Sequence, residues 1–305
     1  MTAFLTQRRG FNIPLSSYGP NCRVLVVGKV PPSDPITNRL RGLEGVSFDF
    51  PSIGAAMKEI PLLDGRAPPL EQRWTILVTP GVYREEIRMK PHVSVMGFGK
   101  DSVFIEPPSS GRFHDPLDNK RATIYMNYGC SISDLVIMKP TSMRSTDYCI
   151  WNKDVYGLRP DGLPFVADFK CLQPSFIGIQ RVSIWPQELK AGATRGKSLL
   201  IQGDWRTVII SDFLASYCGT EGFDVEIRGH QICDCHLVNV FLDALFMEDE
   251  GGCLSVASAH DVHIRNSLLR AGMSKAWSEA PPFDMPSPAS CVTASNGAFV
   301  WLEST

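Results

Sequence analysis

The chain has 305 residues, a formal net charge of -2 at pH 7, 44% hydrophobic residues and 20% charged residues. This near-neutral balance provides no basic field of the kind that holds nucleic acid or an anionic membrane surface, and no run approaches the roughly 18 apolar residues of a membrane span. We therefore expect a globular protein with neither a nucleic-acid partner nor a membrane partner.

The N-terminal part contains one predicted helix. Residues 1–47 are interpreted as a lead-in, and because no apolar signal core follows Arg8 and Arg9, the chain as given is expected in the cytoplasm. From Pro51 to Ile60 apolar residues recur at helical spacing, and Pro61 ends the pattern. Such a helix is suited to cover the open end of a stacked β structure.

Beyond residue 105 a recurrent unit dominates the chain. An extended run, a small or polar break, and a second extended run with a short polar residue at a fixed place follow one another, as in solenoids whose coils bury a core by stacking. The second runs are 132–137, 179–184, 210–215, 232–237 and 264–269. The other extended runs are 122–127, 198–202, 223–228, 253–257, 291–294 and 298–302.

Alternation along the second runs assigns their faces. If the Ile that opens each run points inward, the polar position two residues later marks a bend, where a short side chain can bond the local backbone. The predicted bend residues are Asp134, Asp212, Asp234 and Asn266. The predicted inward columns after the bend are Leu135, Val182, Phe213, Cys235 and Ser267, then Ile137, Ile184, Ala215, Leu237 and Leu269. Three irregular stretches, 106–120, 140–173 and 274–290, are predicted to be inserted loops.

Three segments of the N-terminal part resemble the opening of pectinesterases and their β-helix relatives. They are residues 50–56, residues 75–87 with Pro80-Gly81-Val82-Tyr83-Arg84-Glu85, and residues 93–99 with Gly97-Phe98-Gly99. In that family these segments form a capping helix, a strand ending in Pro-Gly-x-Tyr-x-Glu, and a Gly-x-Gly turn. The resemblance covers residues 48–105 and implies an all-β fold, a right-handed parallel β-helix.

The resemblance and the repeats together predict a single β-helix domain over residues 1–305. In this division, residues 48–105 hold the capping helix and the first coils. Residues 106–305 form the further coils with their inserted loops.

A weaker resemblance concerns catalysis. The segment Phe241-Leu242-Asp243-Ala244-Leu245-Phe246 is similar to a pectinesterase motif, aromatic-Gln-Asp-Thr-Leu-aromatic, whose Asp is an acid/base residue. Asp243 falls on that Asp, whereas Leu242 and Ala244 replace the neighbouring Gln and Thr. The family's nucleophile strand, Val-Asp-Phe-Ile-Phe-Gly, and its Leu-Gly-Arg-Pro-Trp motif have no counterpart here. Pectin demethylation needs both carboxylates and the Arg, so it is not expected.

His236 is the second candidate catalytic residue. The face assignment places it outward together with Val136, Ser183, Leu214 and Leu268, on a surface that is mostly apolar. Such a surface is either covered by an inserted loop or lines a pocket for a hydrophobic ligand.

We predict a functional groove at this surface. His236 and Asp243 are its expected catalytic pair, in which the carboxylate orients or charges the imidazole ring. The expected substrate contacts are Leu214, Leu268, Tyr148, Trp151 and Trp185, with the aromatic side chains closing the groove against water beneath the segment 140–173.

No metal site and no cofactor is predicted. The nine cysteines are an odd number without paired spacing, which favours reduced and mostly buried thiols. Cys233 and Cys235 lack the second pair that a structural zinc site needs. The cluster Glu248-Asp249-Glu250 is interpreted as a solvated loop.

Two classes of function remain. In the first, the chain is an intracellular enzyme that isomerises, cyclises or eliminates a small, largely apolar molecule without a cofactor. In the second, it is a carbohydrate-active or glycan-binding β-helix protein, either a divergent esterase or lyase or a fibre module. The apolar outward surface and the lost esterase motifs favour the first class. Self-association into a homo-oligomer is left open.

Overall fold

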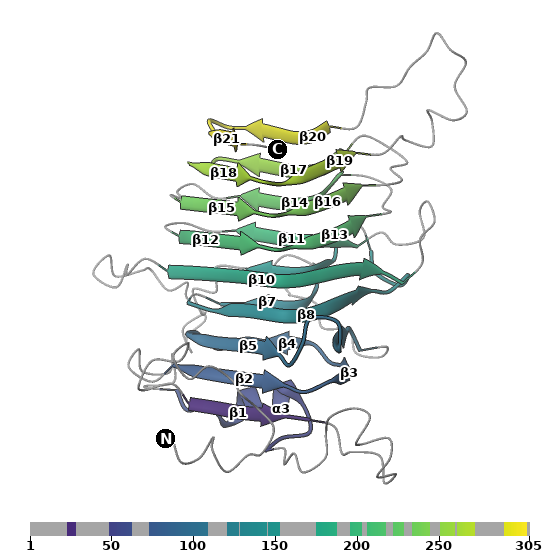
Figure 1. Ribbon diagram of the computed structural model, residues 1–305, viewed down its shortest axis with the longest axis vertical. Coiled ribbons are helices and arrows are strands. Elements are labelled where there is room, and N and C mark those ends of the chain that lie inside the picture. The colour runs from purple at the N-terminus through teal and green to yellow at the C-terminus, as the bar shows by residue number, and fades with distance from the viewer. Residues whose placement is uncertain are drawn as a thin grey trace, which may run out of the picture.

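The computed structural model describes residues 23–28, 49–62, 73–108, 121–127, 129–144, 146–152, 175–187, 196–202, 206–217, 222–228, 234–244, 251–259, 261–271 and 290–303. These residues wind into stacked coils, which contribute strands to two sheets (Figure 1). Neighbouring strands pair in parallel, coil upon coil, from β1 with β2 to β18 with β21. The predicted parallel β-helix is confirmed.

The first sheet has 14 strands among the described residues and follows the path β1-β2-β5-β8-β10-β12-β15-β18-β21, with five short strands beside it. Its strands are β1 (Arg23–Val27), β2 (Trp74–Val78), β3 (Gly81–Arg84), β5 (Val93–Gly97), β6 (Val103–Glu106), β8 (Ser131–Lys139), β10 (Ser175–Pro186), β12 (Arg206–Ser211), β13 (Leu214–Tyr217), β15 (Asp234–Val238), β16 (Phe241–Ala244), β18 (Val262–Arg265), β19 (Leu268–Ala271) and β21 (Val300–Glu303).

The second sheet has 7 strands among the described residues. They are β4 (Ile87–Arg88), β7 (Ala122–Met126), β9 (Tyr148–Asn152), β11 (Lys197–Gln202), β14 (Gly222–Arg228), β17 (Gly251–Ala257) and β20 (Ser290–Ser295). Strand β9 lies inside the stretch 140–173 that the sequence predicted to be an irregular loop. That expectation is wrong for residues 148–152, because they pair with β7 and β11 on either side.

The predicted capping helix is present as α3 (Ile53–Glu59). Ser52 is its N-cap, and the hydroxyl oxygen of that residue accepts a hydrogen bond from the Ala55 amide at 3.1 Å. The Glu85 carboxylate, from the Pro-Gly-x-Tyr-x-Glu segment, accepts two further hydrogen bonds, from the amides of Ile53 at 2.9 Å and Gly54 at 2.7 Å. The first coil therefore holds the start of the helix that covers it.

Three of the four predicted bend residues are confirmed. Asp134, Asp212 and Asn266 have positive φ angles of 57°, 51° and 48°, a conformation that Asp and Asn tolerate better than most residues. Asp234 is not a bend residue, because it lies in β15 opposite Thr207. The bend of that coil is Asn239, with a φ of 54°.

The fourth repeat is consequently displaced by five residues from its predicted place. Leu237, not Ile232, pairs with Ile210 and with Ile264 of the adjoining coils. In the two inward columns after the bend, Val240 and Leu242 replace the predicted Cys235 and Leu237, and both are buried.

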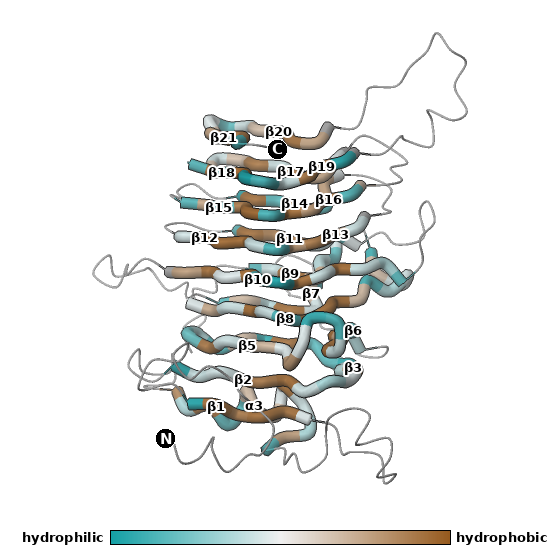
Figure 2. The backbone as a smooth tube through the Cα atoms, in the orientation of Figure 1, coloured by the Kyte–Doolittle hydropathy of each residue, from teal (hydrophilic) through white to brown (hydrophobic). Residues whose placement is uncertain are grey.

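The core is a continuous column of apolar side chains along the axis of the solenoid. Figure 2 shows hydrophobic residues recurring along the strands of successive coils. One such column consists of Ile132, Ile179, Ile210, Leu237 and Ile264, each at most 1% exposed. Burial of one such side chain contributes roughly 1.5–3 kcal/mol before the entropic costs of folding.

The coils bend within the second sheet at β7, β9, β11, β14 and β17. Cys149 and Ile150 are consecutive, yet both lie in the core, and the paired registers on either side of Cys149 skip this position. The corresponding positions in other coils are Thr123, Ser198, Asp224 and Cys253, all buried. Burial raises the pKa of the Cys149 and Cys253 thiols to about 12, so both remain protonated near neutral pH.

Candidate functional site

His236 lies on the outward side of β15 and contacts groups other than those predicted. Its Nε2 atom is 2.5 Å from Oδ1 of Asp234. Its ring stacks on that of His263 in the next coil, with 5.2 Å between centroids. Residues that are in register in successive coils form a row along the sheet. The row of His236 and His263 continues to Ile209 in the preceding coil and to Trp301 in the following one. The carboxylate beside His236 is therefore that of Asp234.

Asp243 lies on β16, beyond the bend at Asn239, and is 4% exposed. Both of its carboxylate oxygens bind the guanidinium of Arg270, with Oδ1 accepting a hydrogen bond from Nε at 2.9 Å and Oδ2 contacting Nη2. The expected contact between Asp243 and His236 is replaced by these separate pairs. Since Arg270 occupies the register position of Asp243 in the next coil, no second carboxylate lies at that position.

The predicted substrate contacts divide between two parts of the molecule. Leu214 and Leu268 flank Phe241 in one outward row, two residues before the row of Asp243 and Arg270. Trp185 is 39% exposed and lies on β10, whose residue Ser183 pairs with Leu214. We call the surface formed by Trp185, Leu214, Phe241, Asp243, Leu268 and Arg270 the Asp243 face. It combines exposed apolar groups with a neutralised carboxylate.

Tyr148 and Trp151 lie on β9 of the second sheet and not on the Asp243 face. They belong to a cluster of buried residues outside the main core, made of Ala122, Tyr125, Tyr148, Trp151 and Leu200. The ring centroids of Tyr125 and Trp151 are 5.8 Å apart. These aromatic residues stabilise the outer surface of the bend and do not close the predicted groove.

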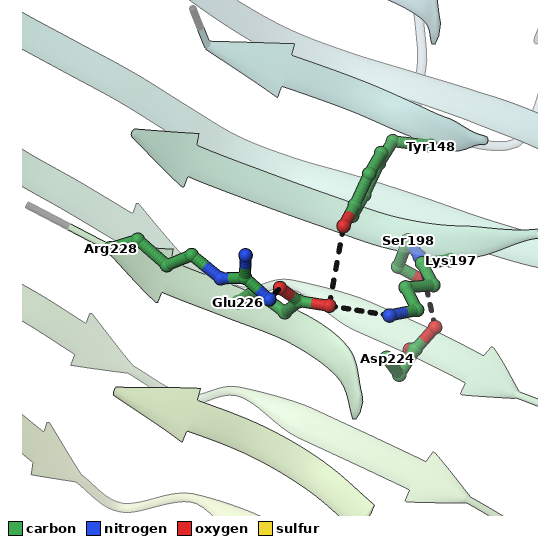
Figure 3. Close-up of polar contacts among 6 residues, drawn as sticks. All are labelled: Tyr148, Lys197, Ser198, Asp224, Glu226 and Arg228. Atoms are coloured by element: carbon green, nitrogen blue, oxygen red, sulfur yellow. Dashed lines mark hydrogen bonds and ion pairs between the residues drawn. The ribbon is translucent and has the colours of Figure 1, made fainter. Parts of the chain in front are cut away.

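A network of charged groups, which the sequence analysis did not identify, adjoins this cluster (Figure 3). The Glu226 side chain on β14 is 2% exposed, and its Oε1 atom accepts hydrogen bonds from the Tyr148 hydroxyl at 3.2 Å and the Lys197 ammonium at 2.5 Å. Its Oε2 atom contacts the Arg228 guanidinium. Burial, together with the Glu226 charge, raises the pKa of the Tyr148 hydroxyl, which therefore stays protonated as the donor.

The Tyr148 side chain also lines a pocket of about 440 Å³. The pocket lies where β3, β6 and β8 end and where β7 and β9 begin. Its charged lining residues are Arg84, Glu86, Glu106, Arg121 and Asp147. Neutral polar groups come from Thr141, Ser142 and Gln187, and apolar surface comes from Pro107, Pro108, Met138, Pro140 and Met143. This volume is in the range of small-molecule sites.

Two ion pairs order the rim of the pocket. Nε of Arg84 is 2.7 Å from a carboxylate oxygen of Glu106, across the β3–β6 pair. Asp147 accepts hydrogen bonds from the Arg144 amide at 3.0 Å and from the Arg144 guanidinium at 3.2 Å. The second pair closes the turn that leads into β9 and so fixes the position of Tyr148.

Several candidate positions lie outside the described residues. They are Cys233, the cluster Glu248-Asp249-Glu250, and residues 153–174, which include most of the proposed roof of the groove. Within the described residues, no helix has the length and apolar character that a membrane span requires.

No protein-family model and no curated protein sequence matches the chain. Among solved structures, the chain is similar to a pectin methylesterase from Aspergillus niger at 12% identity, covering 94% of this chain and 85% of that one with a TM-score of 0.42. A pectin methylesterase in complex with a hexasaccharide is similar at 11% identity, with 91% and 80% covered and a TM-score of 0.29.

The ORF18 protein of Geobacillus virus E2 is similar at 8% identity and a TM-score of 0.33, with 82% of this chain and 43% of that chain covered. The similarities assign no activity, and the fold itself follows from the parallel strand registers described above.

Proposed function

We propose that this chain is a saccharide-binding β-helix protein whose ligand occupies the pocket beside Tyr148. The observation that best supports the proposal is the mixed lining of a cavity of about 440 Å³, which combines hydrogen-bond donors, acceptors and apolar surface. A sugar presents hydroxyl groups around its edge and C–H groups on its faces, so it needs both kinds of wall. The Met138 and Met143 side chains supply apolar surface that adapts to shape.

The charge of the pocket favours a neutral saccharide over a uronic acid polymer. Two guanidinium groups, Arg84 and Arg121, and three carboxylates, Glu86, Glu106 and Asp147, line the pocket. Each of these carboxylates is paired with a guanidinium, that of Arg88, Arg84 or Arg144. A polyanionic ligand would therefore meet mainly guanidinium groups that already have a carboxylate partner. The chain is accordingly expected to bind neutral oligosaccharides better than galacturonate chains.

Blocking the pocket tests this proposal. Ser142 lines the pocket and is exposed, so Ser142→Trp should fill the cavity without disturbing the core. We expect the affinity for a neutral hexasaccharide, chosen by screening gluco-, xylo- and galacto-oligosaccharides, to fall by at least about tenfold, which corresponds to about 1.4 kcal/mol. Isothermal titration calorimetry measures this change.

Thr146→Trp is the matched control, because Thr146 is exposed and close in sequence but does not line the pocket. It should keep the affinity of the unmodified chain. Absence of binding to every neutral oligosaccharide, or equal loss in both variants, would contradict the proposal. Tighter binding of oligogalacturonate would contradict its charge argument.

The Asp243 face supports a second candidate function, the binding of a small and largely apolar molecule by an enzyme that needs no cofactor. The specific observation is that four residues predicted from the sequence to form the site share this face, namely Trp185, Leu214, Leu268 and Asp243. Leu268 is 54% exposed and Trp185 is 39% exposed, which leaves apolar surface for a ligand. Isomerisation, cyclisation and elimination remain the reactions proposed here.

Leu268→Lys tests the second candidate, because an ammonium in the apolar row should repel an apolar ligand. Native mass spectrometry of the full chain after incubation with a metabolite extract should show an adduct that this variant loses. Ile209→Lys, at an exposed residue of another row, should keep the adduct. An adduct that survives Leu268→Lys, or no adduct at all, argues against a ligand on this face.

A further inference from the structure

Tyr148 lines the pocket, but the far end of its side chain is held from another part of the solenoid. Its ring lies beside Lys197, its register partner on β11, with the ammonium 5.9 Å from the ring centroid. The hydroxyl reaches one strand further and donates to the Glu226 carboxylate on β14 at 3.2 Å (Figure 3). Neighbouring strands are about 4.8 Å apart, so the contact spans two coils. A wall of the pocket is thus held by a residue that does not itself line it.

The hydrogen bond between Tyr148 and Glu226 has a defined direction. Two cationic groups, Lys197 and Arg228, contact the Glu226 carboxylate, and a charged carboxylate only accepts hydrogen bonds. Burial and the Glu226 charge raise the pKa of the Tyr148 hydroxyl, so the phenol keeps its proton and directs it to Glu226. Toward a ligand, the phenol oxygen can therefore accept a hydrogen bond but not donate one.

This network provides orientation more than stability. The Glu226 side chain is 2% exposed, and the cost of removing its carboxylate from water offsets much of its attraction to the two cations. The side chains of Lys197 and Arg228 are 14% and 49% exposed, so both can turn toward solvent when the carboxylate is removed. Loss of Glu226 should therefore leave the fold intact, while the Tyr148 hydroxyl loses this acceptor.

We propose that Glu226 is a positioning residue of the pocket, which acts on a bound saccharide only through the Tyr148 side chain. The inference rests on the function proposed above for this pocket. With its hydroxyl held by Glu226, Tyr148 is ordered before a ligand arrives, and binding does not have to immobilise it. The direction of the hydrogen bond also allows the phenol oxygen to bind a sugar hydroxyl that donates, but not a ligand group that only accepts.

A cycle of variants tests the proposal by isothermal titration calorimetry. The probe is the neutral hexasaccharide that binds most tightly among the gluco-, xylo- and galacto-oligosaccharides. Glu226→Ala should lower its affinity by roughly two- to tenfold, the cost of ordering one side chain on binding. Tyr148→Phe removes only the hydroxyl and should cause a similar loss. The losses should not add in the double variant, because each change removes the same contact.

Glu226→Gln is the conservative variant. Its amide oxygen can still accept from the Tyr148 hydroxyl, so it should keep most of the affinity that Glu226→Ala loses. Arg181→Met is the control for general destabilisation, because it removes another two-point ion pair, that with Asp134, and Arg181 does not line the pocket. This control should bind the hexasaccharide as the unmodified chain does.

Nuclear magnetic resonance reports the contact without any ligand. In a chain labelled with carbon-13 at Cζ of its seven tyrosines, the resonance that Tyr148→Phe lacks belongs to Tyr148. That resonance should shift in Glu226→Ala and stay in place in Arg181→Met. Circular dichroism and the melting temperature establish that each variant is folded.

Three results would overturn the proposal while the hexasaccharide still binds: additive losses in the double variant, an unchanged Tyr148 resonance in Glu226→Ala, or an equal loss of affinity in Arg181→Met. If no neutral oligosaccharide binds the unmodified chain, the proposed function fails, and the role of Glu226 in binding fails with it. The two failures are thus distinguished by the unmodified chain alone.

Discussion

Replacing Lys139 by Met is expected to lower the free energy of unfolding by about 3–5 kcal/mol, the usual cost of removing one partner of a buried ion pair. Lys139 is 0% exposed, and its ammonium lies inside the solenoid, 2.7 Å from the Asp224 carboxylate and 3.1 Å from the Ser216 carbonyl. Because β8 pairs with β10 and β10 with β13, the side chain reaches two coils along the axis. Met retains most of the packing but leaves Asp224 without its cation.

Urea denaturation followed by circular dichroism measures this loss. Arg84→Met is the matched control, since its ion pair with Glu106 is exposed and should contribute no more than about 1 kcal/mol. In the double variant Lys139→Met/Asp224→Asn, the amide oxygen still accepts from the Ser198 amide, which donates to Asp224 at 2.9 Å in the unmodified chain. That variant should recover part of the stability. A loss in Lys139→Met no larger than in Arg84→Met would show that the pair contributes little.

The sequence carries enough local information to predict the fold. Ser52 is followed by an apolar helical pattern that Pro61 ends, and α3 forms there. Asp134, Asp212 and Asn266 adopt the left-handed conformation at equivalent bends, because a short polar side chain tolerates it. A residue with this preference at a regular place in an apolar run is a local signal, and it can be recognised without knowledge of the neighbouring coil.

Register is not a local property, and there the prediction failed. Asp234 and Asn239 both follow apolar residues at the spacing of the template, and the two alternatives differ only in which residues they oppose in the coils on either side. Pairing Leu237 with Ile210 and Ile264 keeps bulky apolar groups in one buried column. Assigning Ile232 to that column displaced His236 by five residues along the coil and associated it with Leu214 and Leu268 instead of Ile209 and His263.

The bend in the second sheet explains why the charged network around Glu226 and the buried Asp224 were not predicted from the sequence. Strict alternation along β14 places Asp224, Glu226 and Arg228 on one outward side, and a reader of the sequence would expect three solvated charges. The bend turns Asp224 inward to Lys139, while Glu226 stays outside, buried beneath Tyr148 and Lys197. The charged residues at every second position of Phe223–Arg228 were the sequence feature that could have indicated this network. The partners, however, come from three different coils, and nothing in the order of the residues connects them.

Gly97→Ala is expected to destabilise the fold by at least about 3 kcal/mol, at the upper end of the cost of overpacking. Gly97 ends β5, where a Cβ atom would lie 1.9 Å from the backbone oxygen of Asp134 in the next coil. Asp134 cannot move freely, since it holds the left-handed bend with a φ of 57° and its carboxylate accepts two hydrogen bonds from Arg181, at 2.5 Å and 2.7 Å. The added methyl group must therefore separate two coils that stack in register.

Gly297→Ala is the control that separates this steric effect from backbone strain. Gly297 has a φ of 75°, and a Cβ atom there would meet nothing within 4 Å, so the variant should cost only the roughly 1–2 kcal/mol of a left-handed Ala. Denaturant titration of both variants, with the slope compared to that of the unmodified chain, gives the two losses. If Gly97→Ala costs no more than Gly297→Ala, the coils at β5 and β8 can separate more easily than their packing indicates.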